Sequence, residues 1–393
     1  MGKKFFYVAA FVASMAFTAV SCSDDKGDGG NGGNGGNGGD ADYAANLDYN
    51  SSNAASWGNY MYNVATLLKQ DATDLYNDWN VSYDGGNSYA VTFKNHNNST
   101  YPSASSCIQE IIEGCSTISD EVGGAKLGDP YNLYQQGKTT EALYAVESWY
   151  SWHSRDDYTN NIWSIRNCYY GSLDGTVNSN SISAIMSTLD PTLDTEVKDA
   201  IQAAANAIQA IEQPLRNNIN SSETVAAMEA CTDLTEKLEA LNTKPQQLFA
   251  SGSYDTQLDA IINQYVDGVV LPTYKSLMEK NEALLTSVTN FKNSPSNENF
   301  AAACNAWLVA REPWEKSEGF LFGPVDAKGL DPNMDSWPLD QVAIVQILES
   351  RNYDDLNWVD SDTDEAIEAS QAVRGFHTLE FLLFKDGQPR TIN

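Results

Sequence analysis

The amino-acid sequence predicts an all-α protein built from two packed, four-helix-bundle-like domains. Apolar residues recur every three or four residues through most of the chain, which is the period of one buried helical face. Segments with a strand pattern are few, and most connections between helical segments are short, which favours antiparallel bundles. Residues 42–393 are also too many for one typical hydrophobic core, so two units are expected.

The longest helical stripe covers residues 258–291, with a kink or an end expected at Pro272. One β-hairpin is expected near residues 81–93, because Asp84-Gly85-Gly86 separates two short β-prone runs. The division between the bundles is placed at residue 250, where Pro and Gly interrupt the helical pattern. Further helical stripes are expected in 57–79, 108–118, 193–215, 225–241, 300–308 and 342–348.

Residues 1–21 have the pattern of a secretory signal peptide. Lys3 and Lys4 precede an apolar run over residues 5–20, which is too short to remain as a membrane-spanning helix. The chain is therefore expected to be exported.

The segment Ala19-Val20-Ser21-Cys22 resembles the lipobox of bacterial lipoproteins, which implies a lipid anchor in the membrane through Cys22. The alternative is cleavage near Ser21, which gives a soluble periplasmic protein. Residues 22–41 are rich in Gly, Asn and Asp and are expected to form a flexible tether. Asp24 and Asp25 resemble a surface-export signal, so we expect an outer-membrane lipoprotein of the cell envelope, periplasmic or surface-exposed.

The chain is strongly acidic, with 53 acidic and 23 basic residues and a net charge of −30. Such a charge repels nucleic acid, which is excluded as a partner, and attracts cations. A solvated acidic surface is the simpler explanation of most of this charge. Besides Cys22, the cysteines form no Cys-x-x-Cys pair and are expected to be buried apolar side chains; they are Cys107, Cys115, Cys168, Cys231 and Cys304.

Residues 373–384 are expected to form a helix that carries Gly375, His377 and Glu380. His377 and Glu380 are three residues apart, so they share one helix face and are close enough to bind one metal ion. An imidazole and a carboxylate together suit iron or zinc. Gly375 is expected in the middle of this helix, where it allows close approach of another backbone. A histidine that is hydrogen-bonded to its own helix is the alternative.

Two further clusters of aromatic and charged residues supply candidate ligand-binding side chains. Arg311, Glu315 and Glu318 are expected on neighbouring turns of a helix bent at Pro313, and solvent-facing salt bridges are the alternative. Asp340 ends the segment Asp335-Ser336-Trp337-Pro338-Leu339-Asp340. The other cluster, residues 146–157, contributes Glu147, Ser148, Ser151 and Asp156.

These clusters together resemble the imelysin family. The matching segments are Arg311-Glu312-Pro313-Trp314-Glu315, Asp335-Ser336-Trp337-Pro338, Gly375-Phe376-His377-Thr378-Leu379-Glu380 and Glu147-Ser148. The resemblance covers most of residues 42–393. It implies a two-domain, all-helical envelope protein with a site at the domain interface. Members were first grouped as metallopeptidases and are also linked to bacterial iron uptake.

The order of these segments differs from the usual family order, in which the Glu-Ser segment follows the Gly-x-His-x-x-Glu helix. We therefore expect a circular permutation, with the family's two ends joined within residues 242–253. Residues 42–250 then resemble the family's C-terminal half, and residues 251–393 its N-terminal half. Permutation at exposed loops leaves the packing intact, so the site is expected to survive.

The favoured function is capture of iron, or of a small iron-bearing ligand, between the two domains of a monomer that serves iron uptake with a transport partner. His377 and Glu380 are the expected metal ligands, and Arg311 offers a bidentate fork for a carboxylate. A zinc metallopeptidase is the first alternative, but such sites normally need three protein ligands, so we expect binding rather than catalysis. The second alternative is a structural lipoprotein that binds nothing at this interface.

Overall fold

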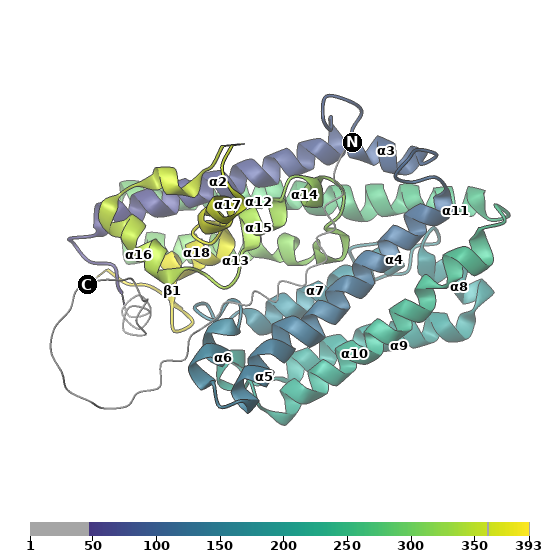
Figure 1. Ribbon diagram of the computed structural model, residues 1–393, viewed down its shortest axis with the longest axis horizontal. Helices are drawn as coiled ribbons and strands as arrows, with labels where there is room; N and C mark the ends of the chain where they lie inside the picture. The colour runs from purple at the N-terminus through teal and green to yellow at the C-terminus, as the bar shows by residue number, and fades with distance from the viewer. Residues whose placement is uncertain (1–46, 360, 393) are drawn as a thin grey trace.

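The computed structural model describes residues 47–359 and 361–392 (Figure 1). Within these residues the regular structure is helical apart from one two-stranded hairpin, which confirms the all-α fold. No helix of the described part is long and apolar enough to cross a membrane. The expected signal peptide, the acylated Cys22 and the tether lie outside the described residues.

One four-helix bundle combines residues from both ends of the chain. Helix α12 packs between α2 and α13, and α18 contacts both α2 and α13. In Figure 1 the purple α2 accordingly lies with the yellow and green helices of the C-terminal part. The four helices are α2 (Ala54–Asn80), α12 (Leu271–Asn293), α13 (Asn297–Glu315) and α18 (Gly375–Leu383).

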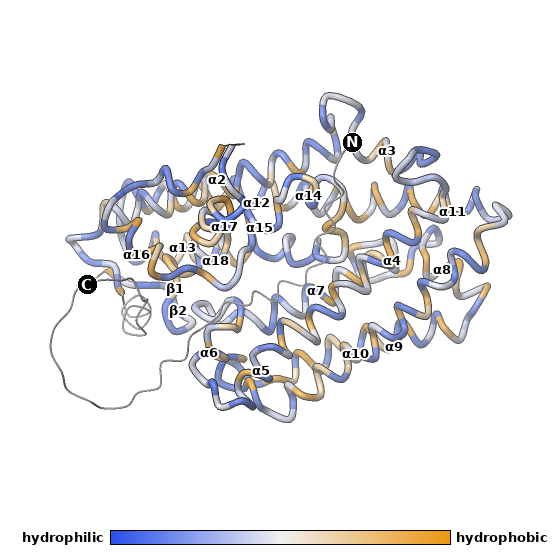
Figure 2. Tube along the Cα trace, viewed as in Figure 1, coloured by the Kyte–Doolittle hydropathy of each residue, from blue (hydrophilic) through white to orange (hydrophobic). Residues whose placement is uncertain are grey.

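The other bundle is continuous in sequence. Helix α10 packs on α4 and α9, while α7 packs on α4 and α9. Hydrophobic and hydrophilic residues alternate along these long helices, as expected when each buries one face (Figure 2). The four helices are α4 (Ala104–Glu121), α7 (Ser154–Tyr170), α9 (Pro191–Ala210) and α10 (Ser222–Asn242).

The predicted division at residue 250 placed α2 in one bundle with the rest of residues 42–250. In the structure α2 packs instead against α12 and α18. Trp57 and Trp79 of α2 are fully buried, and the indole nitrogen of Trp57 donates a hydrogen bond to Leu382 O of α18 (2.9 Å). Helix α2 therefore belongs by packing with residues 271–383. The assignment of two independent domains and the circular permutation stay predictions.

The two bundles meet where α13 contacts α7 and where the short helix η5 (Glu318–Phe320) packs on α4 and α7. A Cβ atom at Gly114 of α4 would collide with the carbonyl oxygen of Gly319, so the two backbones are in direct contact. This contact fixes Glu318 at the junction.

The expected long helix at 258–291 is present, but it does not end at Pro272. Helix α11 (Asp255–Tyr265) continues through the π-helical segment η4 (Val266–Val270) into α12. The amide of Leu271 bonds to Val266 O, five residues earlier, and Pro272 lies in the first turn of α12. The wider turn lets the chain pass a proline, which has no amide hydrogen to donate.

The hairpin expected near residues 81–93 is wrong, because Tyr89–Asn95 forms helix α3. Ser88 caps this helix by accepting a hydrogen bond from the amide of Val91, and the buried Tyr89 and Phe93 lie one turn apart. The hairpin that exists pairs β1 (Phe384–Lys385) with β2 (Gln388–Pro389).

The remaining elements are short and connect the long helices. They are the helices α5 (Gly128–Gln135), α6 (Thr139–Ala145), α8 (Ile182–Leu189), α14 (Pro324–Ala327), α15 (Leu330–Asp335), α16 (Gln341–Ser350) and α17 (Asp364–Gln371), the π-helical segments η1 (Val122–Leu127) and η3 (Pro245–Phe249), and the 3₁₀ turns η2 (Leu215–Asn217) and η6 (Tyr353–Leu356).

Candidate functional site

Gly375 was expected in the middle of a helix, but it is the first residue of α18. The helix is interrupted between α17, which ends at Gln371, and α18. Its φ angle is +82°, a conformation that glycine adopts without strain. A Cβ atom at this position would lie 2.5 Å from Met334 O and 3.2 Å from Asn333 O. Close approach of another backbone is therefore confirmed, and it places Asp335, the last residue of α15, beside His377.

His377 is completely buried, but its surroundings are polar. Its Nδ1 atom lies 3.2 Å from Glu380 Oε2, and its Nε2 atom lies 3.1 Å from Asp335 Oδ1. Burial and the charge of Arg311 lower the pKa of His377, but the charge and hydrogen bond of Asp335 outweigh both and raise it to about 9. With this raised pKa, His377 is an imidazolium at neutral pH, held between the carboxylates of Glu380 and Asp335.

Arg311 of α13 is the second buried cation of the site. Its guanidinium pairs with Asp335, lies 2.6 Å from Glu315 Oε1 and approaches Asp157 Oδ2 to 3.7 Å. Burial alone lowers the pKa of Arg311, but these carboxylates raise it well above its ordinary value. The side chain is 0% exposed, so the alternative of a solvent-facing salt bridge is wrong.

The loop before α7 brings the other bundle to this network. Glu380 Oε1 accepts hydrogen bonds from the amide and the hydroxyl of Ser151, at 2.8 and 2.7 Å. Ser148 donates to Asp157 Oδ2 at 2.6 Å, and His153 Nδ1 lies 2.7 Å from Asp157 Oδ1. Side chains of both bundles therefore converge on α18.

Three carboxylates form a compact group next to His377. One oxygen from each of Glu315, Glu318 and Asp335 lies within 4.8 Å of the others, a spacing that suits a metal ion. Burial raises the pKa of Glu315 to about 8, although Arg311 opposes the shift. Asn161 Nδ2 donates to Glu315 Oε2 at 2.6 Å, which orients that carboxyl group.

Glu318 is the exceptional member of this group. It is only 7% exposed, yet its carboxylate forms no hydrogen bond or ion pair with the residues that the structure describes. Burial raises the pKa of Glu318 well above its usual range, and the nearby Lys126 only partly opposes this. A buried acid without a partner is costly unless a proton or a cation neutralises it.

The structure brings some predicted residues together and separates others. Glu147 pairs with Lys126 at 3.1 Å. Asp340 is exposed and caps α16 through the amide of Ala343 (2.9 Å), so it lies outside the site. Asp156 is half-buried and accepts a hydrogen bond from Gln209 (3.1 Å). The converging predicted residues are Gly375, His377, Glu380, Arg311, Glu315, Glu318, Ser148 and Ser151.

Three residues that complete the network were missed. Asp335 opens the Asp-x-Trp-Pro segment, so the correct segment was chosen but the wrong aspartate, Asp340, was taken from it. Asp157 and Asp156 lie four and three residues after His153, and both spacings predict a helical pair, so the sequence did not distinguish the buried Asp157 from the partly exposed Asp156. The third, Lys126, lies in a π-helical turn that no sequence pattern indicated.

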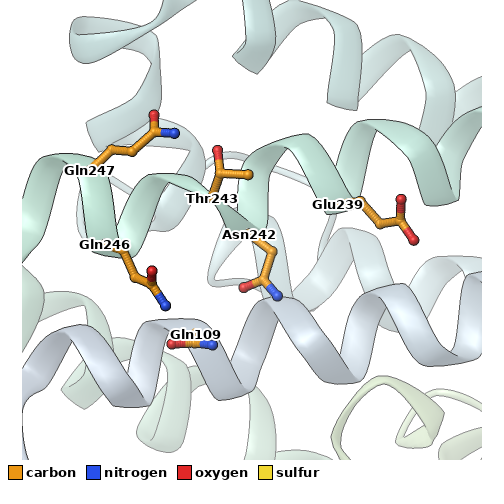
Figure 3. A pocket seen from close by; sticks show the side chains of 6 residues that line it. All are labelled: Gln109, Glu239, Asn242, Thr243, Gln246 and Gln247. Carbon is orange, nitrogen blue, oxygen red and sulfur yellow. The ribbon is translucent and has the colours of Figure 1, made fainter.

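His377 is 0% exposed, so no open pocket reaches it from the surface. A pocket with a volume of about 430 Å³ lies between α4 and the end of α10, and its lining side chains are drawn in Figure 3. None of the predicted site residues lines it; the lining residues are Gln109, Glu239, Asn242, Thr243, Gln246 and Gln247.

Comparisons with known proteins agree with this fold. The sequence model of the imelysin family matches residues 27–241 and 270–393. A crystal structure described as an imelysin peptidase from Bacteroides ovatus is 60% identical and covers 89% of this chain and all of its own, with a TM-score of 0.87. Iron-regulated protein A of Synechococcus elongatus is 34% identical over 132 residues, which span 33% of this chain and only 32% of that protein.

Proposed function

The chain belongs to the imelysin family, and we propose that it captures iron, as an ion or in a small ligand, for uptake at the bacterial cell envelope. The name of the cyanobacterial relative, Iron-regulated protein A, supports the choice of metal. In this proposal the protein is a lipoprotein anchored through Cys22, and it passes iron to a transport partner.

The observation that carries the proposal is the group formed by Glu315, Glu318 and Asp335. Its oxygen atoms converge within 4.8 Å, and Glu318 has no other partner among the described residues. Three buried acids repel one another, so a cation between them relieves both the repulsion and the missing solvation. Carboxylate oxygens with one imidazole nitrogen suit iron.

His377 is the nitrogen donor nearest to these carboxylates, since its Nε2 atom is 3.1 Å from Asp335 Oδ1. Glu380 holds the ring through Nδ1, and Ser151 in turn holds Glu380. A metal ion would replace the proton on Nε2, and a carboxylate behind the ring at Nδ1 would fix the ring and strengthen Nε2 as a ligand. In this proposal His377 is a metal ligand, as expected from the sequence, whereas Glu380 acts through His377 and is not itself a ligand.

A zinc peptidase is the second candidate, because the Bacteroides ovatus relative is described as a peptidase. A catalytic metal needs an open coordination position for water and substrate. His377 and Glu315 are both 0% exposed, so the site has no room for a peptide substrate beside the metal, which favours capture of a small ion over hydrolysis. A structural interface accounts for the paired charges of Arg311, but not for the unpaired carboxylate of Glu318.

Titration calorimetry of the full chain with ferrous, ferric and zinc ions tests the proposal. We expect iron binding, and we expect Glu318→Gln to weaken it at least tenfold because the unpaired ligand is lost. The control Glu282→Gln changes an exposed glutamate and should leave the affinity unchanged. Tight zinc binding with a hydrolysis that His377→Ala abolishes would support the peptidase instead. No uptake of any ion would support the structural interface.

A further inference from the structure

The α6–α7 loop, residues 146–153, has a strained backbone at two positions. Ser148 and Trp152 have φ angles of +50° and +61°, in the left-handed region that L-residues adopt only at a cost. Such a conformation persists only where surrounding contacts hold it, and it is typical of functional sites. Ser151 lies between these two residues, and its amide and hydroxyl both donate to Glu380 Oε1. The position of Glu380 therefore depends on the contacts that hold this loop.

The turn of the β1–β2 hairpin makes one set of these contacts. The amide of Gly387 donates a hydrogen bond to Tyr150 O at 2.9 Å. A Cβ atom at Gly387 would lie 2.5 Å from Trp152 Cδ2, so the backbone of the turn lies directly against the indole ring. The turn therefore contacts the residues on both sides of Ser151. Since β1 follows α18 directly, the segment that carries Glu380 returns to hold the loop that in turn holds Glu380.

Arg216, in the η2 turn between α9 and α10, makes the other set of contacts. Its Nη1 atom donates to Trp149 O at 3.2 Å, and its Nη2 atom lies 3.0 Å from Asp386 Oδ1 in the hairpin turn. Its guanidinium also lies over the rings of Trp149 and Trp152, 4.6 and 5.3 Å from their centres. A planar guanidinium can form two directed hydrogen bonds while it stacks on aromatic rings, so one side chain joins the loop to the hairpin.

We propose that Arg216 and the Asp386-Gly387 turn are positioning residues for His377, because together they hold the α6–α7 loop in the conformation in which Ser151 binds Glu380. Glu380 Oε2 lies 3.2 Å from His377 Nδ1, so a displacement of Ser151 reaches the imidazole through a single carboxylate. The inference rests on the proposed function where it concerns the metal, since a histidine without its orienting carboxylate is a poorer ligand. The orientation of the ring itself does not depend on that function.

Gly387→Ala tests the contact at the hairpin turn. The new Cβ atom meets the Trp152 ring at 2.5 Å and should move Ser151 away from Glu380. Gly85→Ala is the matched control, because Gly85 has a φ angle of +74° against +73° at Gly387, but a Cβ atom there meets nothing within 4 Å. Both variants therefore carry the same backbone cost, and only Gly387→Ala disturbs the loop.

Two measurements on the folded full chain report the outcome. NMR of the metal-free, ¹⁵N-histidine-labelled protein detects the proton on His377 Nδ1, which is assigned by its loss in His377→Gln. We expect a strongly hydrogen-bonded proton in the wild type and in Gly85→Ala, and its loss in Gly387→Ala. Calorimetric titration with ferrous ion under anaerobic conditions should show binding weakened about tenfold or more by Gly387→Ala, the usual cost of losing a group that orients a metal-bound histidine. Gly85→Ala should leave the affinity unchanged.

Arg216→Gln provides a second arm if Gly387→Ala does not fold. This variant loses the ion pair and the stacking, so we expect the same loss of the His377 proton and weaker iron binding. Arg166→Gln is the matched control, because Arg166 also stacks over an indole ring, that of Trp163 at 4.4 Å, but lies within α7, outside the loop. It should change neither measurement.

The two measurements separate this inference from the proposed function. If folded Gly387→Ala and Arg216→Gln keep both the His377 proton and the wild-type affinity, the inference is overturned, while iron binding by the wild type still supports the proposed function. A wild type without a hydrogen-bonded proton on His377 Nδ1 also overturns the inference. If the wild-type chain binds no iron, the proposed function fails, whereas loss of the proton in the two variants still supports the positioning role.

Discussion

Replacing Gly375 by alanine perturbs the contact that places α15 against α18. The φ angle of +82° costs an L-residue about 1–2 kcal/mol. The new Cβ atom would also lie 2.5 Å from Met334 O, and relieving such an overlap in a packed core costs about 1–3 kcal/mol. We therefore expect Gly375→Ala to lower the free energy of unfolding by about 3 kcal/mol.

Urea denaturation followed by circular dichroism measures this loss. Gly124→Ala is the matched control, because a Cβ atom there meets nothing within 4 Å, and it should change stability by less than about 1 kcal/mol. A loss of less than about 1 kcal/mol in Gly375→Ala would show that neither the φ angle nor the contact with Met334 constrains this position. Since Asp335 follows Met334, the variant should also weaken iron binding.

Three further predictions concern the buried network. Arg311→Lys keeps the charge but loses the fork between the carboxylates, and it should cost about 3 kcal/mol in urea unfolding; a change under about 1 kcal/mol contradicts the pairing. Trp314→Phe removes the hydrogen bond from the indole to Asp335 Oδ2 (2.7 Å) and should cost about 1–2 kcal/mol by the same measurement. Burial lowers the pKa of His153, but Asp157 outweighs burial and raises the pKa from 6.5 to about 9. The ion pair with Asp157 therefore stabilises the fold fully below pH 6.5, and this stabilisation is lost as the pH rises through 9. His153→Gln should flatten the dependence of the free energy of unfolding on pH between 6.5 and 9. An unchanged dependence in this variant would refute the role of the His153–Asp157 pair.

The helical fold followed from the sequence because apolar periodicity reports directly which face of a segment is buried. The expected hairpin near residues 81–93 failed for a local reason. Asp84-Gly85-Gly86 is a turn signal, but Ser88 starts a helix immediately after it, and a cap outweighs the β-propensity of a short aromatic run. The hairpin at residues 384–389 has the same kind of signal, Asp386-Gly387, with positive φ at both residues, yet its strands are too short to show a period.

The site was predictable only along single helices. The spacing of His377 and Glu380 placed them on one face, and the spacing of Arg311 and Glu315 did the same. The contacts between elements were not accessible in this way. Asp335 reaches His377 because two backbones touch at Gly375, a tertiary contact that no spacing encodes.

The packing of α2 against α12, α13 and α18 has a consequence for biosynthesis. A ribosome makes α2 well before its three partners α12, α13 and α18. The apolar stripe of α2 therefore stays uncovered at least until α12 has emerged, and such exposed stripes are where nascent chains aggregate or recruit chaperones. The bundle that carries His377 can therefore be completed only after α18 has been synthesised.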